Sequence, residues 1–142
     1  MSKIMALDLG DQWVGVALSD VLGIFAKPYT TVPTAELEPF IQKITKEERI
    51  KDVVIGYPRT MRGGESNQTR KVVASKEKLA LLFPEVSFIL WDERLSSKWA
   101  EAISSSKTKE EKLRSHARAA AFILDNYLSY LQNQKVENIS DY

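Results

Sequence analysis

Cysteine is absent from the chain, which excludes disulfide bonds and thiolate metal ligands. No apolar run approaches the roughly 18 residues that a membrane-spanning helix needs, and no secretory apolar segment follows Met1. Histidine occurs only once, at position 116. We therefore expect a cytoplasmic protein whose metal ligands, if it has any, are mainly oxygen atoms.

An excess of charge of one sign is missing too. The chain has 20 Lys and Arg residues and 19 Asp and Glu residues, so it is not globally basic as many nucleic-acid binders are. The charge is uneven, however, and a basic cluster stands against Glu65 alone. This cluster consists of Arg59, Arg62, Arg70 and Lys71. It fits either a polyanion site or a plain solvated surface, and charge alone does not decide between them.

Strand and helix patterns alternate along the 142 residues, a length typical of one domain. Pro28 indicates an edge strand or a bulge, and Gly56, Tyr57 and Pro58 are expected to stop a strand. The patterns predict strands at 3–9, 13–18, 24–32, 51–55 and 86–91. They predict helices at 37–44, from Ser66 to Phe83, from Ser96 or Ser97 to Ile103, and from about 109 to 131.

The order of these elements predicts a mixed α/β fold. Three strands joined by hairpins should be antiparallel, and the two strands that follow helices should be parallel, so we expect one five-stranded sheet flanked by helices. The domain should cover residues 1–131, and the polar segment 132–142 is expected to be a disordered tail.

Two carboxylates stand out at the ends of predicted strands. Asp8 lies within an apolar strand, where a buried carboxylate costs several kcal/mol unless it is paired or bound to a metal. Glu93 follows the apolar run that ends at Trp91. If the two strand tips lie side by side, their oxygens suit a hard cation such as Mg²⁺ or Mn²⁺. The alternatives are that Asp8 is only a hydrogen-bonded residue at a strand end, and that the strand before Glu93 simply reaches the protein surface there.

Four groups of motifs, in register over nearly the whole chain, resemble the YqgF (RuvX) family. They are Ala6–Gly10 with Val14–Asp20, Val54–Pro58 with Met61–Gly64, Trp91–Ser96, and Ala117–Tyr127. The resemblance implies an RNase H-like fold related to the RuvC Holliday junction resolvases. It also implies a metal-dependent nuclease that processes the 5′ end of pre-16S ribosomal RNA.

The resemblance further implies the site residues. Asp8, Glu93 and the position filled by His116 would be catalytic and would hold Mg²⁺ or Mn²⁺, as two ions clamping the scissile phosphate. Phosphate contacts would come from the basic cluster and from Arg94, which could instead form a surface ion pair. The family carries an Asp where this chain has His116, and Asp125 cannot replace it because nine residues place it on the opposite helix face.

Three readings of function remain open at this point. The first is the ribosomal RNA nuclease, acting as a monomer or weak homodimer. The second is a Holliday junction resolvase acting on DNA, which requires a symmetric dimer. The third is a catalytically impaired nucleic-acid-binding or ribosome-assembly factor. It is favoured by His116 and by Gln12-Trp13, which stand where the family has an Asp and a basic pair.

Overall fold

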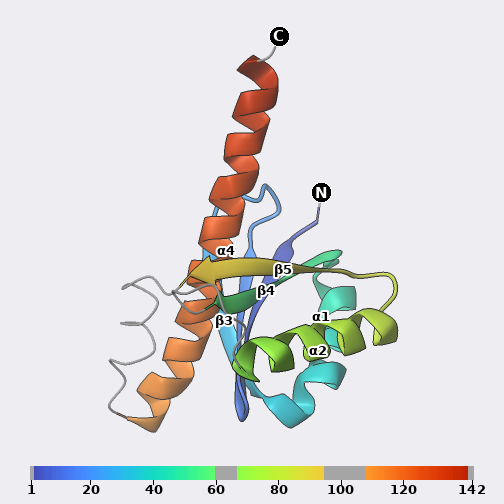
Figure 1. The fold of residues 1–142 in the computed structure, drawn as a ribbon, viewed down its shortest axis with the longest axis vertical. Helices are drawn as coiled ribbons and strands as arrows, with labels where there is room; N and C mark the ends of the chain where they lie inside the picture. The colour runs from blue at the N-terminus through green and yellow to red at the C-terminus, as the bar shows by residue number, and fades with distance from the viewer. Residues whose placement is uncertain (1, 60–66, 95–107, 141–142) are drawn as a thin grey trace.

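The structure, a computed structural model, describes residues 2–59, 67–94 and 108–140. One five-stranded sheet organises these residues, in the order β3-β2-β1-β4-β5 (Figure 1). The strands are β1 (Ile4–Leu9), β2 (Trp13–Ser19), β3 (Ala26–Pro33), β4 (Asp52–Arg59) and β5 (Ser87–Arg94). The hairpin strands β1, β2 and β3 pair antiparallel, whereas β4 pairs parallel to both β1 and β5. The predicted mixed sheet is therefore confirmed.

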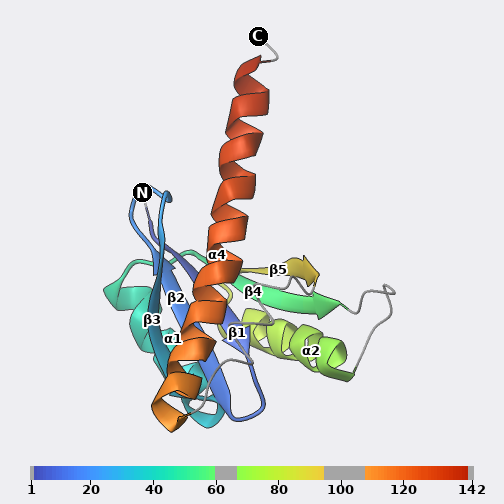
Figure 2. The same cartoon turned by 90° about the vertical axis from the view of Figure 1, so that its left-hand side faces the viewer.

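Helices cover both faces of the sheet (Figures 1 and 2). They are η1, a 3-10 turn (Thr34–Glu36), and the α-helices α1 (Leu37–Glu47), α2 (Asn67–Leu82) and α4 (Lys109–Ser140). Because side chains alternate along a strand, Leu7 joins the core under α1 and α2, whereas its neighbour Ala6 joins the core under α4. The face of the sheet on which a strand residue lies is thus fixed by its position along the strand.

Glycines let α4 lie unusually close to the sheet. A Cβ atom built on Gly15 would lie 1.9 Å from the carbonyl oxygen of His116, and one on Gly56 would lie 2.3 Å from Cδ1 of Ile123. Both distances are far inside van der Waals contact. At position 15 the obstacle is helix backbone, which cannot rotate away as a side chain can.

Two boundaries differ from those expected. β4 does not stop at Gly56–Pro58 but continues to Arg59, because its ladder to β5 runs on after its ladder to β1 has ended at Ile55. Proline is tolerated in such a strand, which is paired on one side only. Instead of ending near 131 before a disordered tail, α4 continues to Ser140, since residues 132–140 contain no helix-breaking Gly or Pro.

Further expectations concern Pro28, the segment 96–103, the Ser66 cap and the domain boundary. The edge position and the bulge predicted from Pro28 are both found: β3 ends the sheet, and its register shifts between the pairs Val16–Thr30 and Ala17–Pro28. The expected helix at 96–103 and the Ser66 cap lie outside the described residues. The domain boundary at 131 stays a prediction.

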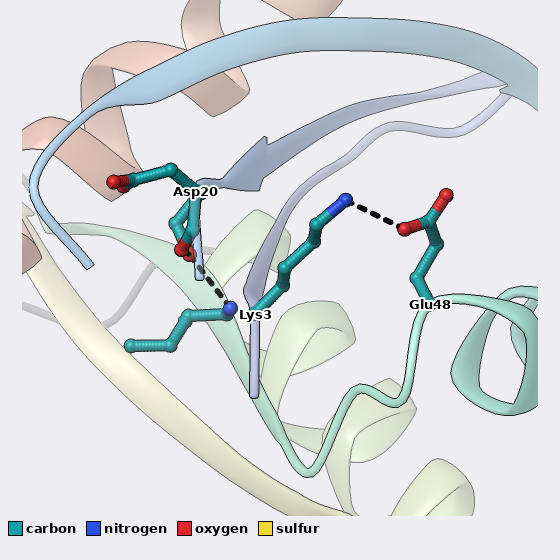
Figure 3. A network of polar contacts seen from close by, with 5 residues as sticks. Lys3, Asp20 and Glu48 are labelled. Atoms are coloured by element: carbon teal, nitrogen blue, oxygen red, sulfur yellow. Dashed lines mark hydrogen bonds and ion pairs between the residues drawn. The ribbon is translucent and has the colours of Figure 1, made fainter. Parts of the chain in front are cut away.

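Polar contacts fix the amino end of β1. Lys3 Nζ lies 2.7 Å from Glu48 Oε2 just after α1 (Figure 3). The amide of Ile4 donates to Ser19 Oγ at 2.8 Å, so the buried hydroxyl ties β1 to the end of β2. These contacts fix the end of β1 that is opposite to the end carrying Asp8.

Asp20 organises the loop between β2 and β3. Its Oδ1 accepts hydrogen bonds from the amides of Ile24 and Phe25, at 2.7 and 2.9 Å, and Gly23 has a left-handed φ of 69°. The Phe25 hydrogen bond is the main reason why the pKa of Asp20 falls below its usual 3.8. The loop therefore depends on an ionised carboxylate.

We predict that this dependence appears below pH 4. A carboxyl whose pKa is lowered by folding stabilises the protein above its unfolded pKa, near 3.9, and loses that effect as pH falls through the folded value. The stability difference between wild type and Asp20→Asn should shrink between pH 7 and pH 2.5 in urea unfolding. A difference that is equal at both pH values would contradict the assignment.

A second prediction concerns Gly15. Gly15→Ala should destabilise the protein by a few kcal/mol and displace α4, because the new methyl group meets helix backbone. Ala17→Gly, on the same strand, removes a methyl group instead and leaves the path of α4 intact. Thermal unfolding of both variants measures stability, and amide exchange of α4 measures its docking. Full retention of α4 protection in Gly15→Ala would show that the helix does not need this close approach.

Candidate nuclease site

Asp8 and His116 meet where α4 crosses the carboxyl end of β1. His116 Nδ1 lies 3.8 Å from Asp8 Oδ2, and the two side chains are 30% and 15% exposed. This separation is longer than a hydrogen bond. Two donors that share one cation at about 2.1 Å lie roughly 3 to 4.2 Å apart, so this oxygen and nitrogen fit a divalent metal.

One row of residues across three strands brings this pair together. Asp8 of β1 is opposite Gly15 of β2, and Gly15 is opposite Thr31 of β3. The His116 backbone lies directly over Gly15. On the far flank of the helix, Thr31 Oγ1 donates a hydrogen bond to the carbonyl oxygen of Leu113. This row therefore determines how far above the sheet the His116 turn of α4 lies. It also supplies one contact to the side of that turn.

Glu93 does not lie on a strand adjacent to Asp8, and the expected side-by-side arrangement of the two strand tips is wrong. β4 lies between β1 and β5, so the backbones are two strand spacings, about 10 Å, apart. In the shared register Leu7, Ile55 and Leu90 form one row, which places Trp91 level with Asp8 and position 93 two residues further along. Position 93 has the strand parity of Trp91, which packs in the core under α4.

Aromatic contacts hold β5 against α4. The Trp91 ring lies 5.3 Å from that of Tyr127, edge to face, and 5.2 Å from that of Tyr130. Burial raises the pKa of Tyr127, with smaller contributions from Asp52 and Tyr130. The strand that carries Glu93 is thus tied to the helix that carries His116.

The predicted phosphate contacts that fall on described residues lie on three elements, β4, β5 and α2. Arg59 and Arg94 are register partners at the ends of β4 and β5. Arg70 and Lys71 are exposed in the first turns of α2, and Lys71 Nζ lies 3.4 Å from Asp11 Oδ1. Arg62 lies outside the described residues. The roles of these residues stay predictions.

Sequence reasoning missed the residues that position the histidine. Gly15 and Thr31 contact α4 backbone, and neither had been considered functional. A glycine inside a strand is a known sign of close backbone approach, so Gly15 in the run Val14-Gly15-Val16 could have been found. Thr31 carried no comparable sign, because its partner is a main-chain carbonyl.

Two absences hold for the described part of the chain. In this part, no group of three or more Asp, Glu or His side chains is placed so that it could hold a metal ion. No helix in the same part is long and apolar enough to cross a membrane.

The fold is that of RuvC. The Thermus thermophilus RuvC structure matches with a TM-score of 0.54 at 12% identity, covering 92% of this chain and 96% of that one. T. thermophilus RuvC in complex with Holliday junction substrate matches with a TM-score of 0.52 at 10% identity, with the same coverage. The sheet therefore has the RNase H-like fold that was expected.

The family follows from the sequence comparisons. Residues 2–130 match RuvX, described as a Holliday junction resolvase. A protein of Rubrobacter xylanophilus named "Putative pre-16S rRNA nuclease" is 38% identical over 127 residues, 89% of this chain and 91% of that protein. Proteins of the same name from Phocaeicola vulgatus and Staphylococcus carnosus are 34% and 36% identical over 90% and 92% of this chain, and 96% and 97% of theirs. The chain belongs to the RuvX family.

Proposed function

We propose that this protein is a divalent-metal-dependent nuclease that hydrolyses phosphodiester bonds at the 5′ end of pre-16S ribosomal RNA. The observation that carries the proposal is the contact between Asp8 and His116, at 3.8 Å. The names of the relatives support the ribosomal substrate. The phosphodiester chemistry is supported by the match to the resolvase family.

Asp8, His116 and Glu93 would hold the metal. These residues would hold Mg²⁺ or Mn²⁺, which when bound would supply water activation and charge neutralisation at the scissile phosphate. Asp8 supplies a carboxylate that is only 15% exposed, in surroundings where competing water is reduced. Glu93 would reach the same face of the sheet from β5, beyond Trp91. Arg59 and Arg94, which pair at the ends of β4 and β5 next to Glu93, would bind the phosphate chain.

His116 makes this site less anionic than one with a third carboxylate. A neutral imidazole binds metal without contributing charge, and at about 4 Å and an effective dielectric near 20 a lost carboxylate is worth at most a few kcal/mol. Mg²⁺ prefers oxygen ligands, whereas Mn²⁺ also accepts nitrogen. The chain should therefore prefer Mn²⁺.

We predict that His116 sets this preference. His116→Asp should tighten Mg²⁺ binding and reduce the Mn²⁺ preference, while His116→Ala weakens both ions. Calorimetric titration of the three proteins with each metal ion measures this. Identical affinities across all three would exclude the histidine from the metal site.

Cleavage tests the function itself. Asp8→Asn and Glu93→Gln keep the side-chain shapes but remove metal-binding charge, so cleavage should fall about a hundredfold or more. Asp125→Asn, an exposed position on the opposite face of α4, is the matched control. The assay uses precursor 16S RNA and a four-way DNA junction with Mg²⁺ or Mn²⁺. Wild-type rates in the Asp8 and Glu93 variants would exclude these two residues from the metal site, and no cleavage by the wild type would refute the nuclease assignment.

The same assay separates the two other candidates. Faster cleavage of the DNA junction would favour a resolvase, as the family description does, and would require a symmetric dimer. Binding without cleavage of either substrate would favour a binding factor, which the single histidine at the metal site makes a specific alternative.

A further inference from the structure

A groove lies between α4 and the edge strand β3. Its volume is about 420 Å³. β3 contributes Pro28, Tyr29, Thr30 and Thr31, and α4 contributes Leu113, Arg114, Ala117 and Arg118. The groove belongs to the α4 face of the sheet, and it is separate from the Asp8–His116 pair because α4 itself stands between them.

Two unpaired arginines make this groove electropositive. Arg114 and Arg118 are both exposed, and four residues apart they lie on one helix face. Neither forms an ion pair within the described residues, although Glu110 is one turn before Arg114. Like charges at this spacing destabilise a helix. The pair costs stability in the isolated protein, so a bound anion is a natural partner.

A bulge in the edge strand borders this groove. Val16 pairs with Thr30 and Ala17 with Pro28, so Tyr29 is the extra residue of β3. Tyr29 is 49% exposed and borders both this groove and the pocket that Lys3 and Glu48 line. Bulges are common next to active sites. An exposed aromatic residue thus stands at the margin of the groove that the arginines line.

The groove and the metal-binding pair lie on opposite flanks of the same helical turns. α4 passes over Gly15, with Asp8 on one flank and Thr31 on the other. Arg114 and Arg118 are two residues before and after His116, hence about 160° away around the helix. The anion site and the cleavage site are therefore separated by one helix diameter, about 10–12 Å.

We propose that this groove binds the phosphate backbone of the second strand of a double-helical substrate whose first strand is cut at Asp8. This inference rests on the proposed nuclease function. The separation matches a nucleic-acid groove that can admit a helix, about 12 Å wide in B-form DNA, and the minor groove of A-form RNA is also wide and shallow. A lone strand in the cleavage site would have to cross over α4 to reach both arginines. The substrate is thus double-helical beside the cut.

The test compares Arg114→Ala/Arg118→Ala with the control Lys43→Ala/Lys46→Ala. The control removes two exposed charges from α1, on the other face of the sheet. Fluorescence anisotropy without divalent metal measures binding to duplex RNA, duplex DNA and single-stranded RNA of equal length. The arginine variant should lose roughly 5- to 10-fold in duplex affinity per contact at about 0.1 M salt, and its salt slope should fall by about 0.9 per contact. Single-strand affinity should change less than about twofold.

Two results would overturn the inference. One is a duplex affinity and salt slope equal to those of the control. The other is an equal loss for single strands and duplexes, which would mean that the arginines attract any nucleic acid. The RNA and DNA arms show which duplex the groove prefers. Because no cleavage is measured, a selective duplex loss supports the groove even if the wild-type protein cleaves neither substrate.

Discussion

The approach of α4 to β2 at Gly15 is the constraint on which the candidate site depends. A side chain at this position would occupy the space of the His116 carbonyl group, and the helix would have to move outward. The reach of an imidazole is fixed, so a displaced helix would carry His116 away from Asp8. Asp8 pairs with Gly15, so the carboxylate lies next to the position where the absence of a side chain admits the helix. The register of β1 and β2 therefore determines both how closely α4 packs and where the candidate ligands lie.

The two faces of the sheet differ in how many apolar side chains they bury. Among the described residues, the core under α1 and α2 has 14 buried apolar members, whereas the core under α4 has seven, and several of these are alanine or valine. Most of the apolar burial thus stabilises the face without the Asp8–His116 pair. On the other face, small residues let one helix lie close to the sheet, at the expense of buried area. Aromatic contacts of Trp91 with Tyr127 and Tyr130 partly offset this at the β5 edge.

The sequence predicted the strands and their directions well, because hairpins and helical crossovers leave few alternatives. It did not predict that β4 lies between β1 and β5, since a crossover pattern does not say on which side the next strand pairs. Asp8 was found because a carboxylate in an apolar run is conspicuous. His116 was found only through the family resemblance. The arginines at 114 and 118 were missed because charges on a long helix are ordinary, and their meaning depends on the edge strand beside them.

The positions of His116 and the two arginines follow from how buried and exposed residues are distributed around α4. Ala117, Ala120 and Leu124 are buried, while His116 stands at the edge of this stripe and Arg118 is exposed. A residue that faced the sheet squarely could not meet a substrate, and one that faced solvent squarely could not reach Asp8. Only the edges of the stripe satisfy both conditions, and a helix has two such edges. One edge holds the imidazole beside the carboxylate, and the other borders the arginine-lined groove. A single helix seated over one glycine can therefore carry, on its two flanks, the imidazole that we propose as a metal ligand and the groove that we propose binds the second strand of the same duplex.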